Sequence, residues 1–331
     1  MGVMADRNGL RGVVAVGASA GGVEALTQMA AELPADLPMA VLVVLHMPID
    51  APSVLARILD RAGPLPAAAA TNGEELESGR LHVCVPNRHL MIDDHRTLVT
   101  RGPTENGHRP AINALFRSAA ITFGPRAIGV LLSGVLDDGV SGLKAIQSRG
   151  GATIAQTPDD ALFPGLPSAA LESGVADYEV RATDVGVLLK QLSEHVSEEP
   201  IMEPDPGLLL ENRIAMAEPF ATDFEIESLG PPSGYTCPDC NGSLQTIGEG
   251  NYRCHVGHAW SAESLLRARD DEVNGALWVA VRSLQEKAQL ARRMASNVSS
   301  GMLQQRFSSQ ADEAEHALRI LTERLTAAGT E

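Results

Sequence analysis

Aromatic residues, cysteines and basic side chains are all scarce in this chain. Only 3% of its 331 residues are aromatic, four are cysteine, and the formal net charge is −16. A hydrophobic core must therefore be built from aliphatic side chains, and so few cysteines in a chain of this length exclude a disulfide-rich scaffold. Nucleic-acid-binding proteins usually carry a basic stripe. The sequence contains none, so we expect no nucleic-acid partner.

Long apolar runs are also missing. No stretch of roughly 18 or more apolar residues occurs, which excludes a membrane-spanning helix, and the N-terminus lacks the basic-then-apolar order of a secretion signal. We therefore expect a cytoplasmic protein with no membrane insertion. The hydrophobic fraction of 44% permits a sizeable core, and the length predicts one large domain with smaller additions.

The first half of the chain alternates short apolar runs with helical patterns. The runs predict strands at residues 13–16, 40–45, 81–85, 127–132, 152–155 and 178–180, and a hairpin at 89–100. Helical spacing of apolar residues is found at 19–33, 112–123, 143–147 and 184–195. This alternation predicts an α/β fold, with a doubly wound, mostly parallel sheet and helices on both faces.

The remaining sequence divides into three further parts. Residues 191–235 carry one basic and ten acidic side chains and no sustained period, which predicts a solvated linker. Two long helical patterns, 262–296 and 303–327, predict a helical hairpin. We therefore predict four parts: a large domain at 10–198, an acidic linker at 199–233, a small Cys/His element at 234–261 and the hairpin at 262–328.

The segment "VVAVGASAGGVEALTQMAAEL" places one hydroxyl, that of Ser19, where a strand passes into a helix. It lacks the lysine of a Walker A loop and the glycine spacing of a dinucleotide-binding loop, so phosphate binding is disfavoured. Two interpretations remain. Ser19 either caps the helix, or it is a nucleophile exposed at the end of the strand, where the helix N-terminus offers N–H groups to a developing oxyanion.

Two other strand ends supply the partners that a nucleophilic serine needs. "VLVVLHMP" places His46 directly after an apolar run, and "AIGVLLSGVLDDGVSGL" places Asp137 and Asp138 in a glycine-flanked loop after another run. In an open parallel sheet the carboxyl ends of the strands form the ligand crevice. A serine, a histidine and an aspartate at three such ends predict a catalytic triad.

Six collinear segments make the chain resemble the catalytic domain of CheB-type protein-glutamate methylesterases. They are "VGASAGGVEAL", "VVLHMP", "VCVPNRHLMI", "HRPAINALFRSAA", "LLSGVLDDGVSGL" and "GGATIAQTPDDALFPGLPSAALESG". The resemblance implies that Ser19 is the nucleophile, His46 the general base and Asp138 the acid, with Asp137 a loop residue. Members of the family hydrolyse glutamate γ-methyl esters on helical receptor proteins and release methanol. Some also deamidate glutamine, and catalysis uses no cofactor.

The resemblance also suggests roles for the residues around this triad. Gly21 and Gly22 would hold the oxyanion, and Arg109 would either meet substrate carboxylates or form a structural salt bridge. "GVLDDG" replaces the family's usual G-M-G-x-D-G, which changes the lining near the acid. The first strand begins near residue 13, which leaves no space for the receiver domain that often precedes this domain, so we expect no control by phosphorylation in cis.

The Cys/His element has the ligand types and spacing of a small zinc ribbon. Cys237 and Cys240 form a C-x2-C knuckle, and after thirteen residues Cys254 and His258 form C-x3-H. Thiolates and an imidazole in this pattern predict a structural zinc ion that fixes a segment too short to build its own core. His255 is the alternative fourth ligand. Cys84 lies in a strand and is predicted to be a buried core thiol.

The function hypotheses differ in the role that they give the C-terminal parts. The first is an esterase acting on a methylated helical receptor protein. The second is a catalytically inactive regulatory scaffold that binds a protein partner through the zinc and helical module. The intact triad favours the first. The two C-terminal helices are predicted to pack on each other, or to dock on a receptor bundle or on a second copy in a homo-oligomer. A zinc-dependent nucleic-acid module is disfavoured by the charge.

Overall fold

The computed structural model describes residues 10–194, 203–217, 230–248, 250–299 and 301–328. The chain divides into two compact units, Met1–Ser264 and Leu265–Glu331. The first unit contains the predicted α/β domain together with the Cys/His element, and the second contains the helical hairpin.

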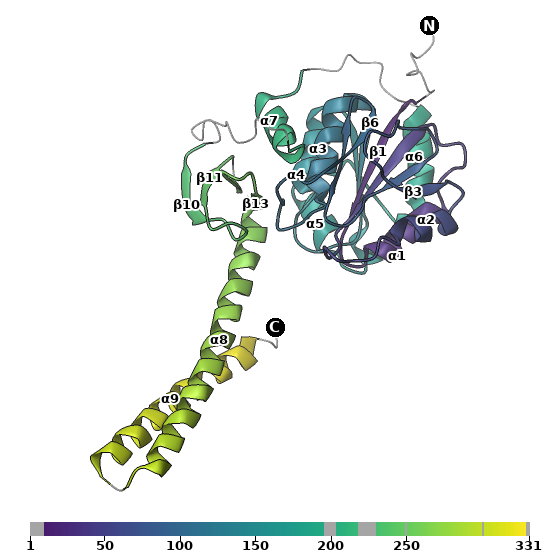
Figure 1. Cartoon of the computed structure of the whole chain (residues 1–331). Helices are drawn as coiled ribbons and strands as arrows, with labels where there is room; N and C mark the ends of the chain where they lie inside the picture. Colours follow the sequence, from purple (N-terminus) through teal and green to yellow (C-terminus); the bar gives the residue numbers. More distant parts are fainter. Residues whose placement is uncertain (1–9, 195–202, 218–229, 249, 300, 329–331) are drawn as a thin grey trace. The chain divides into compact units, whose positions relative to one another are not determined.

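A seven-stranded sheet forms the centre of the first unit (Figure 1). All neighbouring strands run parallel, in the order β3-β4-β2-β1-β7-β8-β9. Every residue of β1 and β2 is buried, which explains why these strands are continuous apolar runs. The predicted α/β fold with a parallel sheet is confirmed. The strands are β1 (Gly12–Ala18), β2 (Met39–Leu45), β3 (Ala67–Ala69), β4 (Leu81–Val83), β7 (Ala127–Leu131), β8 (Ala152–Gln156) and β9 (Tyr178–Val180).

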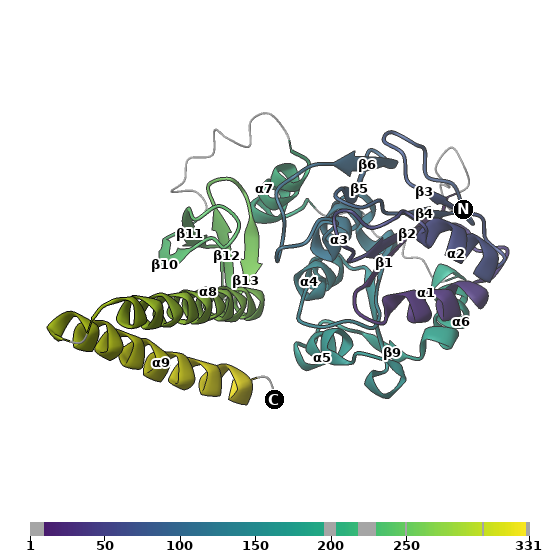
Figure 2. The ribbon, with the colours of Figure 1, turned by 60° about the horizontal axis from the view of Figure 1, so that its bottom comes forward.

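Helices cover both faces of this sheet (Figure 2). One face carries α1 (Gly22–Ala31), α2 (Leu55–Ala62) and α6 (Val185–Glu194), and the other carries α3 (Ile112–Phe123), α4 (Val140–Ser148) and α5 (Gly165–Glu172). The predicted hairpin, β5 (His89–Asp93) and β6 (Arg96–Thr100), packs against α3. The sequence analysis does not predict α2, α5 or β3, each of which has eight residues or fewer, although α2 has an amphipathic pattern that buries Leu55, Ala56 and Leu59.

The strand order places the carboxyl end of β1 at a switch point. From β1 the chain continues to β2 on one side, and it later enters β7 on the other side of β1. In open parallel sheets ligands bind at such a point, in the crevice outside the carboxyl ends of the strands. Residues that follow β1, β2 and β7 are therefore close in space although they are far apart in the sequence.

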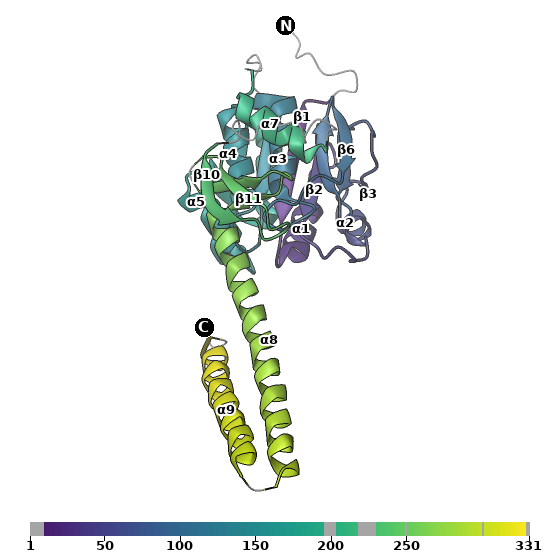
Figure 3. The same cartoon turned by 60° about the vertical axis from the view of Figure 1, so that its left-hand side comes forward.

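Part of the predicted linker is helical, which corrects the prediction for 199–233. Helix α7 (Pro206–Ala215) packs against α3, as Figure 3 shows. Asp205 caps α7 by accepting two hydrogen bonds from N–H groups of its first turn, at 2.9 and 3.2 Å. Aspartate at the cap followed by proline is a favoured helix start, and the linker prediction overlooked it. The segments 195–202 and 218–229, with the predicted domain boundary at 198, lie outside the described residues.

The Cys/His element is a four-stranded antiparallel sheet, which we call the ribbon. Its strands are β10 (Pro232–Thr236), β11 (Ser243–Thr246), β12 (Asn251–Cys254) and β13 (Ala259–Ser261), paired in chain order. Few of its apolar side chains are buried, Leu244 and Trp260 among them. So small a core needs additional cross-links, which are described with the site below.

The second unit is a hairpin of two long helices that lie side by side in Figures 1 and 3. They are α8 (Ala262–Asn297), whose start up to Ser264 belongs to the first unit, and α9 (Met302–Ala328). The predicted hairpin is confirmed. Val281 is buried together with five alanines, whereas Leu266, Leu290 and Leu303 are exposed. The buried alanines are Ala288, Ala291, Ala295, Ala311 and Ala314. Among the described helices, none has the length and apolar character needed to cross a membrane.

Candidate active site

The structure brings Ser19, His46 and Asp138 into one hydrogen-bonded row. Ser19 follows β1, His46 follows β2 and Asp138 lies in the loop after β7. The Ser19 Oγ is 3.1 Å from His46 Nδ1, and His46 Nε2 is 2.7 Å from Asp138 Oδ2. Because an ionised carboxylate only accepts hydrogen bonds, Nε2 carries the proton. The lone pair of Nδ1 therefore faces the serine hydroxyl, which is the arrangement a general base requires.

The Asp138 carboxylate is buried and is held in its charged form. It accepts the backbone N–H of Ile112 at the start of α3 (2.7 Å) and an N–H of the Asn106 side chain (3.3 Å). Burial alone would raise the pKa of Asp138, but the hydrogen bond and charge of His46, with the nearby His108 and the Ile112 N–H, hold that pKa below its usual value. A permanently ionised carboxylate can stabilise an imidazolium that forms next to it.

Backbone contacts fix the three loops relative to one another. The Ser19 N–H donates to the carbonyl of Ser133 (2.9 Å), and the His46 N–H donates to the carbonyl of Ala18 (3.1 Å). The Ser133 hydroxyl donates to the carbonyl of Ala20 (2.8 Å) and accepts the Phe163 N–H (3.0 Å). Sequence reasoning missed Ser133, because nothing local in the sequence marks a buried serine that joins two distant loops.

The glycines after Ser19 shape the turn into α1. Gly21 occupies the N-cap position with φ +68°, a left-handed conformation that favours glycine. The Gly22 N–H donates to the carbonyl of Ser19 at 2.9 Å. Gly21 occupies the cap position and the Ser19 hydroxyl faces His46. The interpretation of Ser19 as a helix cap is therefore wrong.

A second histidine, His108, lies flat against His46. Its ring stacks on that of His46 with centroids 3.7 Å apart and planes inclined by 14°. Burial, and then the charge of His46, lower the pKa of His108 to about 4, against the opposing effect of Asp138. His108 is therefore neutral at pH 7 and supports the His46 ring without repelling its protonated form. The sequence places it in the "HRP" motif, but only the neighbouring arginine was singled out there.

Arg109 has partners within the protein. Its Nε and Nη2 donate to Asn87 Oδ1 (2.9 and 2.6 Å), and its Nη1 donates to the carbonyl of Gly102 (2.9 Å). These partners are an amide and a carbonyl rather than a carboxylate, so the contacts form no salt bridge. Arg109 lines, with His46, Met47 and other residues, a cavity of about 380 Å³ beside the base.

Comparison with known proteins shows the family of the chain. The family profile described as CheB methylesterase matches residues 14–189, more than half of the chain. The chain belongs to the CheB methylesterase family. It also resembles the crystal structure of the Thermotoga maritima CheB methylesterase catalytic domain, with a TM-score of 0.52 and 29% identity over 55% of this chain and 98% of that one.

Two curated relatives of this CheB-family chain carry the name protein-glutamate methylesterase/protein-glutamine glutaminase. Number 3 of Anaeromyxobacter dehalogenans is 44% identical over 167 residues, which is 50% of this chain and 49% of the relative. Number 4 of Myxococcus xanthus is 37% identical over 175 residues, which is 53% of this chain and 50% of the relative. The chain thus spans about half the length of the curated relatives it matches.

The loop before the acid departs from the CheB pattern at Leu136. This residue stands where the family motif usually has glycine, and its φ is +62°. A left-handed backbone costs a non-glycine residue about 1–2 kcal/mol, so Leu136 holds strain directly beside the Asp pair. Strain of this kind is often found next to functional sites.

We expect Leu136→Gly to leave the free energy of unfolding unchanged or to raise it by up to about 1 kcal/mol. The variant relieves the left-handed strain, and the greater entropy of glycine in the unfolded chain offsets part of that gain. Leu136→Ala is the control, because it removes the same side chain but keeps the strain. Urea unfolding measures both, and a Leu136→Gly protein less stable than Leu136→Ala would contradict the assignment of strain.

The buried histidines give the CheB-like domain a defined pH dependence. Burial lowers the pKa of His82, His89 and His108 below the ordinary value of about 6.5. Below pH ~6.5 the unfolded chain therefore binds more protons than the folded one, and the free energy of unfolding decreases as the pH is lowered. We expect the free energy of unfolding to be highest above pH ~6.5 and to decrease steadily towards pH 4.

Urea titrations at pH 7.5, 6 and 5 measure this effect. His108→Phe keeps an aromatic ring against His46 but removes one titrating group, so its stability should fall less steeply with acidification than that of the wild type. A stability that does not change between pH 7.5 and 5 would contradict the expectation.

The four predicted metal ligands converge in the ribbon. The ligand atoms of Cys237, Cys240, Cys254 and His258 all lie within 4.8 Å of one another. The separations between Cys240 and Cys254 Sγ (3.6 Å) and from His258 Nδ1 to the thiols of Cys237 (3.7 Å) and Cys254 (3.4 Å) fit the edges of a tetrahedron. Zinc bonds of about 2.0–2.3 Å give edges of roughly this length. The alternative ligand, His255, is exposed and is not part of the group.

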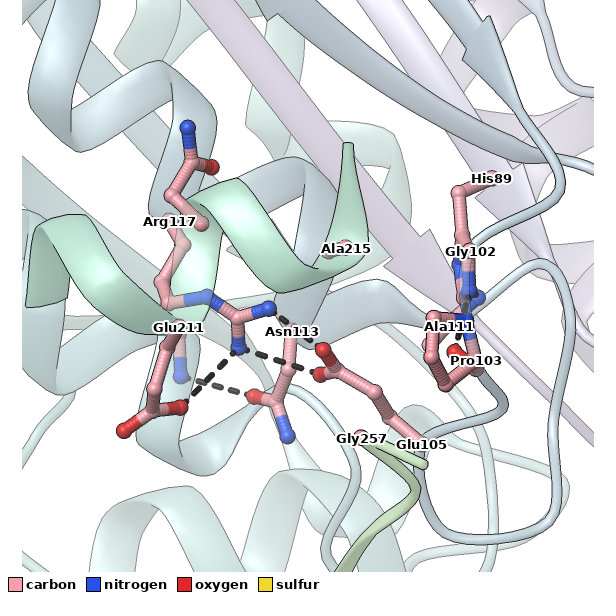
Figure 4. Close-up of polar contacts among 12 residues, drawn as sticks. His89, Gly102, Pro103, Glu105, Ala111, Asn113, Arg117, Glu211, Ala215 and Gly257 are labelled. Atoms are coloured by element: carbon pink, nitrogen blue, oxygen red, sulfur yellow. Dashed lines mark hydrogen bonds and ion pairs between the residues drawn. The ribbon is translucent and has the colours of Figure 1, made fainter. Parts of the chain in front are cut away.

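A buried network of charges joins the ribbon, α3 and α7 (Figure 4). Glu105 accepts two hydrogen bonds from the Arg117 guanidinium, one of them at 3.0 Å, and lies 3.7 Å from Arg253 of the ribbon. Arg253 also pairs with Glu211 of α7 at 3.2 Å. Burial would raise the pKa of Glu105, but Arg117 and Arg253 hold it below its usual value. The network cross-links the ribbon to the CheB-like domain.

Proposed function

We propose that the protein is a serine esterase that hydrolyses γ-methyl esters of glutamate on a methylated, helical, receptor-like protein. The observation that carries the proposal is the hydrogen-bonded row of Ser19, His46 and Asp138 at the switch point of the sheet. Membership in the CheB methylesterase family and the names of the curated relatives support the substrate class.

The reaction is an acyl transfer in two steps. His46 Nδ1 takes the proton of the Ser19 hydroxyl, whose oxygen attacks the ester carbonyl, and the imidazolium then gives that proton to the departing methoxy group to form methanol. Water, deprotonated by the same imidazole, attacks the acyl-enzyme and releases glutamate and free Ser19. Asp138 keeps the imidazole oriented and stabilises its charged form. A glutamine side chain would follow the same route with ammonia as the leaving group.

We assign the oxyanion site to the turn at Gly21 and Gly22. The Gly22 N–H already donates to the Ser19 carbonyl, so Gly21 is the stronger candidate of the two. Because the Arg109 guanidinium has partners within the protein, we propose that it shapes the cavity beside His46 rather than pairing with a substrate carboxylate.

The direct test incubates the protein with methyl-labelled membranes from its own cells and measures the released volatile methanol. A fluorophosphonate probe provides a substrate-independent test, since it labels only an activated serine. We expect labelling at Ser19 that is lost in His46→Ala. An unlabelled wild-type protein would support the alternative of an inactive scaffold.

We further propose that the ribbon holds one structural zinc ion through Cys237, Cys240, Cys254 and His258. Zinc there would cross-link the two knuckles, and it takes no part in the ester chemistry. Native mass spectrometry should find one zinc per chain, and none in Cys240→Ser. Cys84 serves as an internal reference, because burial raises the pKa of its thiol to about 12 and it should stay unreactive towards thiol reagents. Three freely reactive ribbon thiols in the untreated protein would contradict the zinc site.

Exposed apolar side chains on the helical hairpin support the proposal of a homo-oligomer. Trp278, Val279 and Ile320 are more than half exposed, and soluble monomers seldom leave such groups of residues open to water. Sedimentation of the full chain should give a mass above that of one chain, reduced by Trp278→Glu with Val279→Glu. A monomer across the accessible concentrations would exclude the oligomer.

A further inference from the structure

We propose that the ribbon is a positioning element of the active site, and that it acts on Asp138 through the side chain of Asn106. This inference rests on the proposed function, because it concerns the same triad. It gives the Cys/His element a role in the reaction, although none of the ribbon residues contacts the scissile bond in the proposed mechanism.

The ribbon strand β13 pairs with the loop 104–108 of the CheB-like domain. The Asn106 N–H donates to the carbonyl of Ala259 (2.8 Å), and the Ala259 N–H donates to the carbonyl of Thr104 (3.1 Å). Glu105 and Ala259 form a parallel bridge at the same place. The loop therefore has a ribbon strand as its neighbour, and its backbone position depends on that strand.

The Asn106 amide connects the same strand to the triad. Its Oδ1 accepts the backbone N–H of Ser261 (2.8 Å), and its Nδ2 donates to Asp138 Oδ1 (3.3 Å). Asn106 is only 8% exposed, so water has little access to replace either bond. The Asn106 amide thus accepts a hydrogen bond from the ribbon and donates one to the carboxylate that orients His46.

Two further contacts lead from β13 to the active-site loops. The ring of Trp260 lies against Gly107, where a Cβ would come within 3.3 Å of it, and the next residue, His108, stacks on His46. Asp137, the neighbour of Asp138, accepts hydrogen bonds from the hydroxyls of Ser261 (2.7 Å) and Ser264 (3.2 Å). A displacement of β13 would therefore move the supports of both the base and the acid.

The proposed zinc ligands lie at the start of this connection. His258 directly precedes β13, and its carbonyl accepts the N–H of Cys254 at 3.0 Å. Bonds from one metal ion to Cys254 and His258 would close the turn between β12 and β13 and fix where β13 begins. Loss of the ion would release that turn, and the Asn106 contact with it.

The test compares the full-length protein with zinc and after chelation, in the wild type and in Asn106→Ala. The rate of Ser19 labelling by a fluorophosphonate reports the triad without needing the receptor. We expect Asn106→Ala and zinc removal each to slow labelling by about tenfold to a hundredfold, since small misplacements of reacting groups have effects of this size. Because both changes remove the Asn106 contact, zinc removal should slow Asn106→Ala by a clearly smaller factor than it slows the wild type, and the remaining effect passes through the contacts of Trp260 and Asp137.

The downfield proton NMR signal of His46 Nε2–H provides a second readout, which a loss of general stability does not change while the protein stays folded. It should be sharp in the zinc-loaded wild type and broadened in both the zinc-free protein and Asn106→Ala. Cys240→Ser should reproduce the zinc-free state without a chelator. Asn72→Ala is the matched control. Asn72 also accepts a backbone N–H, that of Val99 at 2.9 Å, but it is exposed and does not line the cavity beside His46.

Three results would overturn the inference. They are labelling in Asn106→Ala that equals the wild type, zinc removal that slows both proteins equally, and a His46 signal that is unaffected by zinc. A wild-type protein that is not labelled at all contradicts the proposed function instead. In that case the NMR signal alone decides whether the ribbon positions Asp138.

Discussion

Ser19→Ala should lower ester hydrolysis by about 10⁴- to 10⁶-fold while the domain stays folded. In the proposed mechanism the Ser19 hydroxyl forms the acyl-enzyme, and without it His46 could activate only water against an ester that is not covalently bound. The side chain contributes little to packing, because its Oγ faces the His46 ring rather than the core. Methanol release from methylated receptor under single-turnover conditions measures the loss.

The matched controls for Ser19→Ala are His46→Ala and the double variant. Residues that act as one unit have strongly non-additive effects, so the double variant should be about as inactive as either single one. Circular dichroism and the thermal midpoint check that the fold is kept. Turnover of Ser19→Ala at the wild-type rate would remove Ser19 from the mechanism.

Arg117→Met should destabilise the first unit by about 3–5 kcal/mol, the largest effect on stability that we expect from a single substitution. Arg117 and Glu105 are both buried, with side chains 4% and 2% exposed. Removal of the guanidinium leaves the Glu105 carboxylate in the interior with Arg253 at 3.7 Å as its remaining partner. A fold that buries a charge without its main partner is far less stable than one with a well-packed apolar pair of the same volume at that place.

A second substitution separates the cost of the unpaired charge from the cost of lost packing. Glu105→Gln added to Arg117→Met removes the charge and should recover part of the lost stability. Arg292→Met is the surface control. Arg292 pairs with Asp312 and Glu315 but is 45% exposed, so we expect little change in the unfolding midpoint. If Arg117→Met and Arg292→Met had equal effects, the buried network would not stabilise the fold.

The three residues of the hydrogen-bonded row could be predicted because each lies in the loop after an apolar run. Ser19, His46 and Asp138 follow β1, β2 and β7, and a parallel sheet brings the carboxyl ends of its strands to one edge. The fold class and the ends of β1, β2 and β7 could be predicted from the same local patterns. The four Cys/His positions are also local, since their spacing alone brings them together in a hairpin.

The residues that support the triad could not be predicted, because their partners are distant in the sequence. His108 stacks on His46, Ser133 joins the loops of Ala20 and Phe163, and Asn106 reaches Ser261. None of these side chains shows a local pattern that marks its contact.

The pairing of β13 with the loop 104–108 has a consequence for synthesis of the chain. All strands of the parallel sheet are complete once Val180 has been made, but the neighbour of the loop is supplied only when Ala259–Ser261 leave the ribosome. Until then the Thr104 carbonyl and the Asn106 N–H lack the hydrogen bonds that β13 will supply, as at an uncovered sheet edge. Such edges pair readily with other chains. The nascent protein is therefore most prone to aggregation during the interval in which the linker and ribbon are being translated.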